Sequence, residues 1–108
     1  MSDASLLADV GPCDDTGHLY INGNEVVSVP LNATRRFQRI LPDGAYNFRF
    51  RVGNGGGWAW AARLRLVVNG TELISVDEVG GSGLFTGTVY NKEWQCTIRD
   101  GKVSEFVA

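Results

Sequence analysis

Four turn dipeptides divide this sequence into short segments and limit what the chain can fold into. They are Asn22-Gly23, Asp43-Gly44, Asn69-Gly70 and Asp100-Gly101. Asparagine or aspartate followed by glycine tolerates the positive φ angles of the tight turns that join antiparallel strands. Between these turns the sequence alternates between apolar and polar residues, which is typical of β-strands with one buried face. We therefore expect β-hairpins rather than helices.

The segments between the turns predict an all-β fold. Strands are expected near residues 17–21, 25–29, 36–41, 45–52, 60–68, 71–76, 84–90, 94–99 and 102–107. In the fourth of these, Phe48 and Phe50 share one side and arginines occupy the other, as in an antiparallel sheet with one solvated face. Such a series predicts a single antiparallel β-sandwich (jelly-roll or lectin-like) or a small β-barrel of about eight or nine short strands.

Length and composition fit one folded domain. The chain has 108 residues, of which 44% are hydrophobic and 20% charged, and this composition argues against disorder. We predict a single β domain over residues 1–108, with residues 1–16 as an N-terminal arm. Within this arm, Ser5 is placed to cap a helical turn that runs to Val10 and covers an open end of the domain.

The cysteines leave two alternatives open. Cys13 and Cys96 either form one bridge or are a free thiol and a small buried hydrophobe. With one histidine they do not form the ligand pattern of a zinc site, and we expect neither a metal nor another cofactor.

No segment of this sequence reads as a membrane or export signal. No apolar run approaches the roughly 20 residues that span a bilayer. The first residues lack the features of a signal peptide, so we predict a soluble, cytoplasmic protein, or a secreted one if Met1 is not part of the natural chain.

The lengths of the connections predict where a binding site lies. If consecutive strands are antiparallel, the connections alternate between the two ends of the domain. The longer ones, at residues 30–34, 53–59 and 77–83, then share one end, which we call the long-loop end. Loops on a rigid scaffold commonly carry recognition.

The long-loop end holds the residues that best fit a ligand. Two tryptophans follow three consecutive glycines, and carboxylate and amide side chains lie in the neighbouring segments; the candidates are Trp58, Trp60, Asn54, Asp77 and Glu78. An indole face beside hydrogen-bonding groups suits a sugar ring. In these features the chain is similar in class to small lectins and carbohydrate-binding modules. The alternative is that both tryptophans continue an inward-facing register and only cover the core.

Basic residues gather in the middle of the chain. Residues 35–65 hold seven arginines against Asp43 alone, although the whole chain has a net charge of −2. If segments 45–52 and 60–68 pair as a hairpin, four arginines share one outer face suited to an anionic partner: Arg49, Arg51, Arg63 and Arg65. The alternative is a solvated face with ion pairs, of which Arg65 with Glu72 across the Asn69-Gly70 turn is one.

Catalytic machinery is not indicated by this sequence. His18 is the only histidine, and as a base it needs a nucleophile and an acidic partner that the sequence does not single out. We expect it on a strand surface opposite Val27 and predict that the chain is not an enzyme. The function predicted first is a carbohydrate-binding module. The alternative is a protein-interaction domain (an inhibitor, immunity-type or assembly subunit) that uses the arginine face or an open sheet edge.

The predicted partner is a glycan or another protein, and self-association stays open. Single-stranded nucleic acid is a weaker candidate because affinity for phosphates comes from uncompensated positive charge.

Overall fold

The computed structural model describes residues 3–13, 16–30, 32–57, 60–80 and 85–108, which form nine strands in two antiparallel sheets. The strands are β1 (Ala4–Val10), β2 (Thr16–Ile21), β3 (Asn24–Val29), β4 (Arg35–Leu41), β5 (Gly44–Gly57), β6 (Trp60–Val68), β7 (Thr71–Gly80), β8 (Phe85–Arg99) and β9 (Lys102–Val107).

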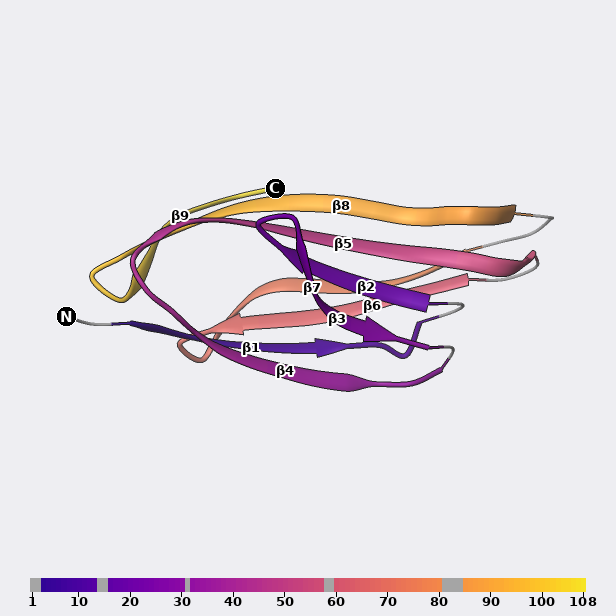
Figure 1. Ribbon diagram of the computed structural model, residues 1–108, viewed down its shortest axis with the longest axis horizontal. Helices are drawn as coiled ribbons and strands as arrows, with labels where there is room; N and C mark the ends of the chain where they lie inside the picture. Colours follow the sequence, from indigo (N-terminus) through magenta and orange to yellow (C-terminus); the bar gives the residue numbers. More distant parts are fainter. Residues whose placement is uncertain (1–2, 14–15, 31, 58–59, 81–84) are drawn as a thin grey trace.

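The two sheets form the layers of a β-sandwich (Figure 1). Sheet A has the strand order β4-β1-β6-β7, and sheet B has the order β3-β2-β5-β8-β9. The all-β prediction is confirmed, and of its two alternatives the sandwich is the one observed. In the described part of the chain, no helix is long and apolar enough to cross a membrane.

The core lies between the sheets and is filled by alternate residues of the inner strands. Leu6 and Val10 of β1 and Phe48, Phe50 and Val52 of β5 are almost completely buried. The alternation of phenylalanine with arginine in β5 therefore marks the core face as predicted, because successive side chains of a strand point to opposite faces.

Three of the four turn dipeptides adopt the predicted conformation. Asn22, Asn69 and Asp100 have φ angles of 52–53°, and the glycine after each also has a positive φ. This is the geometry of a two-residue hairpin turn. Asp43 differs, because it connects β4 of sheet A to β5 of sheet B and does not have a positive φ. Its carboxylate accepts hydrogen bonds from the backbone N–H groups of Asp100 and Gly101 (2.8 and 3.1 Å) and so joins two turns at one end of the sandwich.

The predicted helical turn in the N-terminal arm is wrong. Residues 4–10 form β1, an inner strand of sheet A that pairs with β4 on one side and β6 on the other. The adjacent Leu6 and Leu7 suggested a helix, but they face opposite sides of the sheet. Leu6 enters the core, while Leu7 lies on the outer face between Gln38 and Val67.

A second correction concerns β8, which was predicted as two strands joined at residues 91–93. It is one strand, Phe85–Arg99, paired along β5. Asn91 and Glu93 lie opposite Arg51 and Arg49, so polar residues that resemble a turn are instead the solvated face of a long strand.

The prediction of a long-loop end agrees with the strand directions. Strands β1, β3, β5 and β7 all run toward the end of the sandwich at the right of Figure 1. Strands β5 and β7 extend to Gly57 and Gly80, so both strands continue further into this end than the sequence predicted.

Candidate functional site

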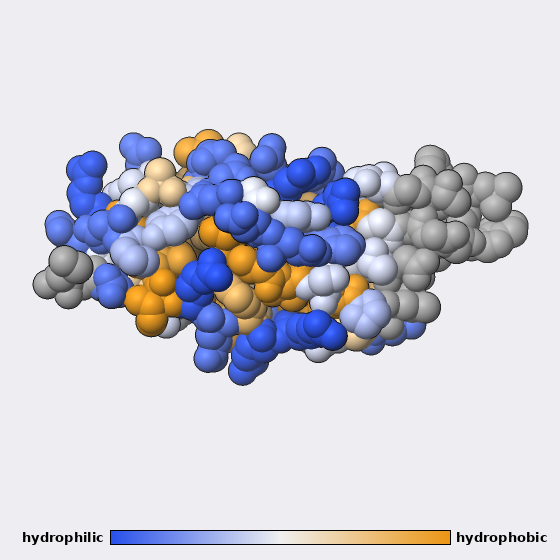
Figure 2. All heavy atoms as spheres, viewed as in Figure 1, coloured by the Kyte–Doolittle hydropathy of each residue, from blue (hydrophilic) through white to orange (hydrophobic). Residues whose placement is uncertain are grey.

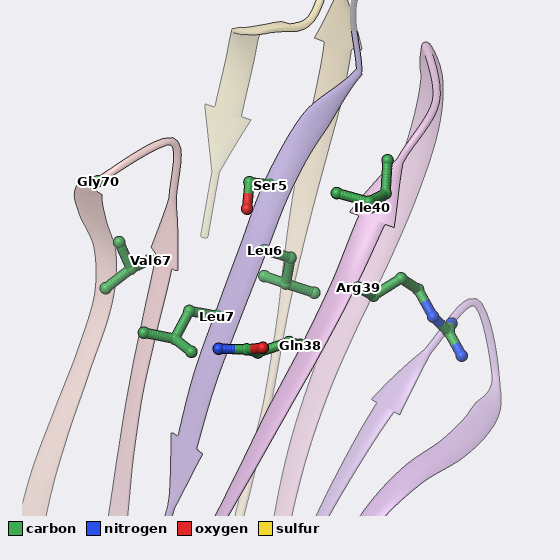
Figure 3. A pocket seen from close by; sticks show the side chains of 8 residues that line it. All are labelled: Ser5, Leu6, Leu7, Gln38, Arg39, Ile40, Val67 and Gly70. Atoms are coloured by element: carbon green, nitrogen blue, oxygen red, sulfur yellow. The ribbon is translucent and has the colours of Figure 1, made fainter.

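A shallow groove of about 540 Å³ crosses the outer face of sheet A. Figure 3 shows Val67, Leu7 and Gln38 in a row across β6, β1 and β4, and the pairing register places them directly opposite one another. Ile40 of β4 has 58% of its surface exposed. The complete lining is Ser5, Leu6, Leu7, Gln38, Arg39, Ile40, Val67 and Gly70.

The rest of this outer face is charged. Three ion pairs occupy it, with N···O distances of 2.8–3.3 Å: Arg36–Asp9, Arg63–Asp77 and Arg65–Glu72. Exposed pairs of this kind stabilise a fold by only about 0–1 kcal/mol each. The outer face of sheet A is therefore divided into an apolar part around Leu7 and a polar part next to it, which is the composition of many protein-binding surfaces.

The two edge strands of sheet A carry charges of opposite sign. Strand β4 contains three arginines and no acidic residue: Arg35, Arg36 and Arg39. Strand β7 contains three acidic residues and no basic one: Glu72, Asp77 and Glu78. The sequence does not reveal this opposition, because strand order is needed to recognise β4 and β7 as the two edges of one sheet.

The predicted single arginine face is wrong, because β5 and β6 do not pair. Strand β5 belongs to sheet B and β6 to sheet A, so the four arginines lie on two different sheets. Arg49 and Arg51 lie over the ring of Tyr20, with guanidinium-to-centroid distances of 5.5 and 5.9 Å. Arg63 and Arg65 form the ion pairs of sheet A, and the predicted Arg65–Glu72 pair is confirmed.

The predicted ligand residues at the long-loop end do not share one face. Trp60 is half-buried, packs against the core, and lies against Gly80 across the β6–β7 pair. Asp77 points to the outer face, where Arg63 binds it, and Glu78 points to the opposite side. Trp58 and the side chain of Asn54 lie outside the described residues.

Glu78 has a partner in the other sheet. Its carboxylate lies near Tyr90 on β8, and burial together with this neighbouring carboxylate raises the pKa of Tyr90. Trp60 and Glu78 face the same side of sheet A, since Trp60 pairs with Gly80 and Ala62 with Glu78. An aromatic and carboxylate cluster of Trp60, Glu78 and Tyr90 therefore occupies this end of the sandwich.

His18 has partners that the sequence analysis did not assign. Its Nδ1 lies 2.5 Å from Oε1 of Glu25, and its Nε2 lies 3.2 Å from Oγ1 of Thr16. His18 pairs with Ser28 rather than with Val27 as predicted. The spacing of Thr16 and His18 by two residues in a strand was the available signal, because such residues share a face.

These three side chains have the carboxylate, imidazole and hydroxyl order of nucleophilic catalysis. They lie on the outer face of sheet B, away from the groove of sheet A, and Glu25 has 44% of its side chain exposed. The expectation that the chain is not an enzyme stays a prediction.

Both cysteines are free and buried, so the disulfide alternative is wrong. Burial raises the pKa of the Cys13 thiol, which lies 3.8 Å from the carbonyl oxygen of Arg63, and burial also raises the pKa of Cys96. Within the described ranges, no group of three or more histidine, cysteine, aspartate or glutamate side chains is placed to hold a metal ion.

Comparison with known proteins does not identify a family. No protein-family model, no curated protein and no solved structure matches this chain.

Proposed function

We propose that this chain is a non-enzymatic interaction domain that binds an extended, acidic protein segment along β4 and the adjoining groove. The observation that carries this proposal is the coincidence of three features on one strand. Strand β4 is a sheet edge, it holds three arginines, and it forms one wall of the apolar groove.

The backbone of β4 supplies the first part of the argument. Among the described strands, β4 pairs only with β1, so its other edge is open to a further strand. An added strand gains affinity from main-chain hydrogen bonds, and its side chains then select the partner. Figure 2 shows a hydrophobic band, bordered by hydrophilic residues, on the side of the sandwich where β3 and β4 form the sheet edges.

The side chains of β4 supply the second part. Ile40 and Leu7 offer apolar contact, while Arg36 keeps 62% of its side chain exposed although it pairs with Asp9. Arginine binds carboxylates in a directed, often bidentate way. A segment that alternates apolar and acidic residues matches both properties.

A peptide titration tests this proposal. The probe is a capped decapeptide of alternating valine and glutamate, added to isotope-labelled protein and followed by amide chemical shifts. We expect shifts confined to β4 and β1, and no shifts of β4 with the matching valine–lysine peptide. The substitution Ile40→Ser should weaken binding about tenfold, whereas Val107→Ser, at an equally exposed apolar residue on β9, should not. Shifts confined to sheet B, or equal shifts of β4 with both peptides, would contradict the proposal.

A second candidate function is carbohydrate binding at the long-loop end. The cluster of Trp60, Glu78 and Tyr90 favours it, because aromatic faces and a neighbouring carboxylate are groups that hold sugar rings. Titration of a glycan panel against tryptophan fluorescence tests it, with Tyr90→Phe as the variant. A glycan that binds wild type and Tyr90→Phe with equal affinity, or a panel in which no glycan binds, would show that the cluster is not a sugar-binding site.

A further inference from the structure

We infer that the acidic segment accepted by β4 is β7 of a second copy of this chain, so that sheet A continues from one molecule into the next. This inference rests on the proposed function and names the partner. Three independent properties of the two edges support it: their direction, their charge and their residue register.

The direction of the strands is correct for such an assembly. Each neighbouring pair in the order β4-β1-β6-β7 is antiparallel, so β4 and β7 of one chain run in opposite directions. A second copy shifted sideways without being turned over therefore places its β7 antiparallel to β4. The shared sheet then remains antiparallel throughout.

The charges on the outer face also continue across this contact. Their sign alternates from strand to strand: β7 contributes Asp77, β6 Arg63 and Arg65, β1 Asp9, and β4 Arg36. A β7 strand beside β4 places acidic residues next to arginine and extends the alternation. Two copies of β4 would instead place arginines against arginines, and two copies of β7 acids against acids, which is unfavourable across paired strands.

One register satisfies both faces of the two strands. With Arg36 opposite Asp77 on the outer face, antiparallel pairing places Arg35 opposite Glu78 on the inner face. The same register places Gln38 opposite Ser75, a polar pair on the outer face. Within the chain's own sheet, Arg35 pairs with buried Val10 and so belongs to the inner face of β4, whereas Gln38 pairs with Leu7 and so belongs to the outer face.

The contact joins two different edges, so it is heterologous and does not close after two copies. Each added molecule presents another free β4 and another free β7. Association is therefore expected to grow beyond a dimer as concentration rises, and to weaken with salt because it depends on exposed charges. Edges β3 and β9 of sheet B lack this opposition, since β3 holds one acidic residue and β9 holds one residue of each sign.

Charge reversal with rescue tests the inference. Sedimentation velocity is measured over a wide concentration range for wild type, Arg35→Glu, Glu78→Arg and the control Lys102→Glu on β9. We expect wild type and the control to associate, and each edge variant alone to stay monomeric. An equimolar mixture of the two edge variants should associate again, because each chain then offers the charge that the other lacks. Circular dichroism confirms that every variant is folded.

Disulfide trapping tests the register without changing any charge. Gln38→Cys and Ser75→Cys proteins are mixed and oxidised, and we expect a covalent heterodimer. In the control, Gln38→Cys is mixed with Ser104→Cys, which carries its cysteine on β9. Within one chain, β4 and β7 are three strand spacings apart, about 14 Å, which is too far for a disulfide.

The outcomes separate this inference from the proposed function. Wild type that stays monomeric while the valine–glutamate peptide binds β4 would overturn self-association and leave the interaction domain intact. Association that neither edge variant reduces, or that Lys102→Glu abolishes, would also overturn the inference, because the contact would then lie elsewhere.

Discussion

The substitution Gly80→Ala tests whether Trp60 covers the core or is free to meet a ligand. A Cβ atom at Gly80 would lie 2.5 Å from Cε2 and Cζ2 of Trp60 and 2.7 Å from its Nε1, whereas ordinary contacts begin near 3.4 Å. The indole must therefore move by about 1 Å. Overpacking of this kind costs about 1–3 kcal/mol.

The substitution also has a stabilising effect that offsets part of the overpacking cost, since Gly80 does not have a positive φ. Replacing glycine where alanine fits the backbone stabilises a protein by about 0.4–1 kcal/mol through the unfolded chain. The free energy of unfolding should therefore fall by about 1–2 kcal/mol in a urea titration, and tryptophan emission should shift to the red. Ser75→Ala, at an exposed residue of the same strand, should change it by less than about 0.5 kcal/mol.

A double-mutant cycle isolates the contact. In a Trp60→Leu background the same Gly80→Ala change should cost nothing or stabilise, because the atoms that it overlaps are gone. If Gly80→Ala leaves the stability and the emission of wild type unchanged, Trp60 does not lie on Gly80. The inward placement of Trp60, and with it the cluster of Trp60, Glu78 and Tyr90, would then be refuted.

Three further predictions concern the stability of the sandwich. Two backbone amides hold the pKa of Asp43 below its ordinary value. Wild type should therefore have a larger free energy of unfolding than Asp43→Asn near neutral pH, and this difference should disappear as the pH falls through the folded-state pKa. Urea titrations at several pH values measure it. Cys13 and Cys96 should react with a thiol reagent more than about a hundredfold faster in urea than in the folded protein; equal rates would contradict their burial. Phe48→Ala should lower the free energy of unfolding by about 3–5 kcal/mol, and Ile40→Ala by less than about 1 kcal/mol, with similar losses refuting the core assignment.

Local signals in the sequence predicted most of the strands. The turn dipeptides and the alternation of Phe48 and Phe50 with arginines are properties of neighbouring residues, and they are reliable for that reason. Strand β1 was missed because Leu7 faces an apolar groove on the outer surface, so its segment does not alternate. The continuity of β8 was missed because Asn91 and Glu93 resemble a turn although they face arginines of β5.

The candidate site depends on contacts that are distant in sequence. The arginines at positions 49, 51, 63 and 65 are close in the chain, yet strand order places them on two sheets. The basic edge β4 and the acidic edge β7 are 30 or more residues apart, and only the order of sheet A makes them its two boundaries. Likewise, the Glu25 partner of His18 follows from the β2–β3 hairpin register, which shifts between Leu19 and Tyr20.

Hydrogen exchange at the backbone amides of the four edge strands tests the central claim most directly. At low protein concentration, the outward amides of β4 and β7 should exchange rapidly, because edge amides lack a neighbouring strand. At high concentration, protection should rise in β4 and β7 together, while β3 and β9 stay unchanged. Saturating valine–glutamate peptide should protect β4 alone. Protection that does not change at β4 under either condition, or that rises at β3 or β9 instead, would contradict the account.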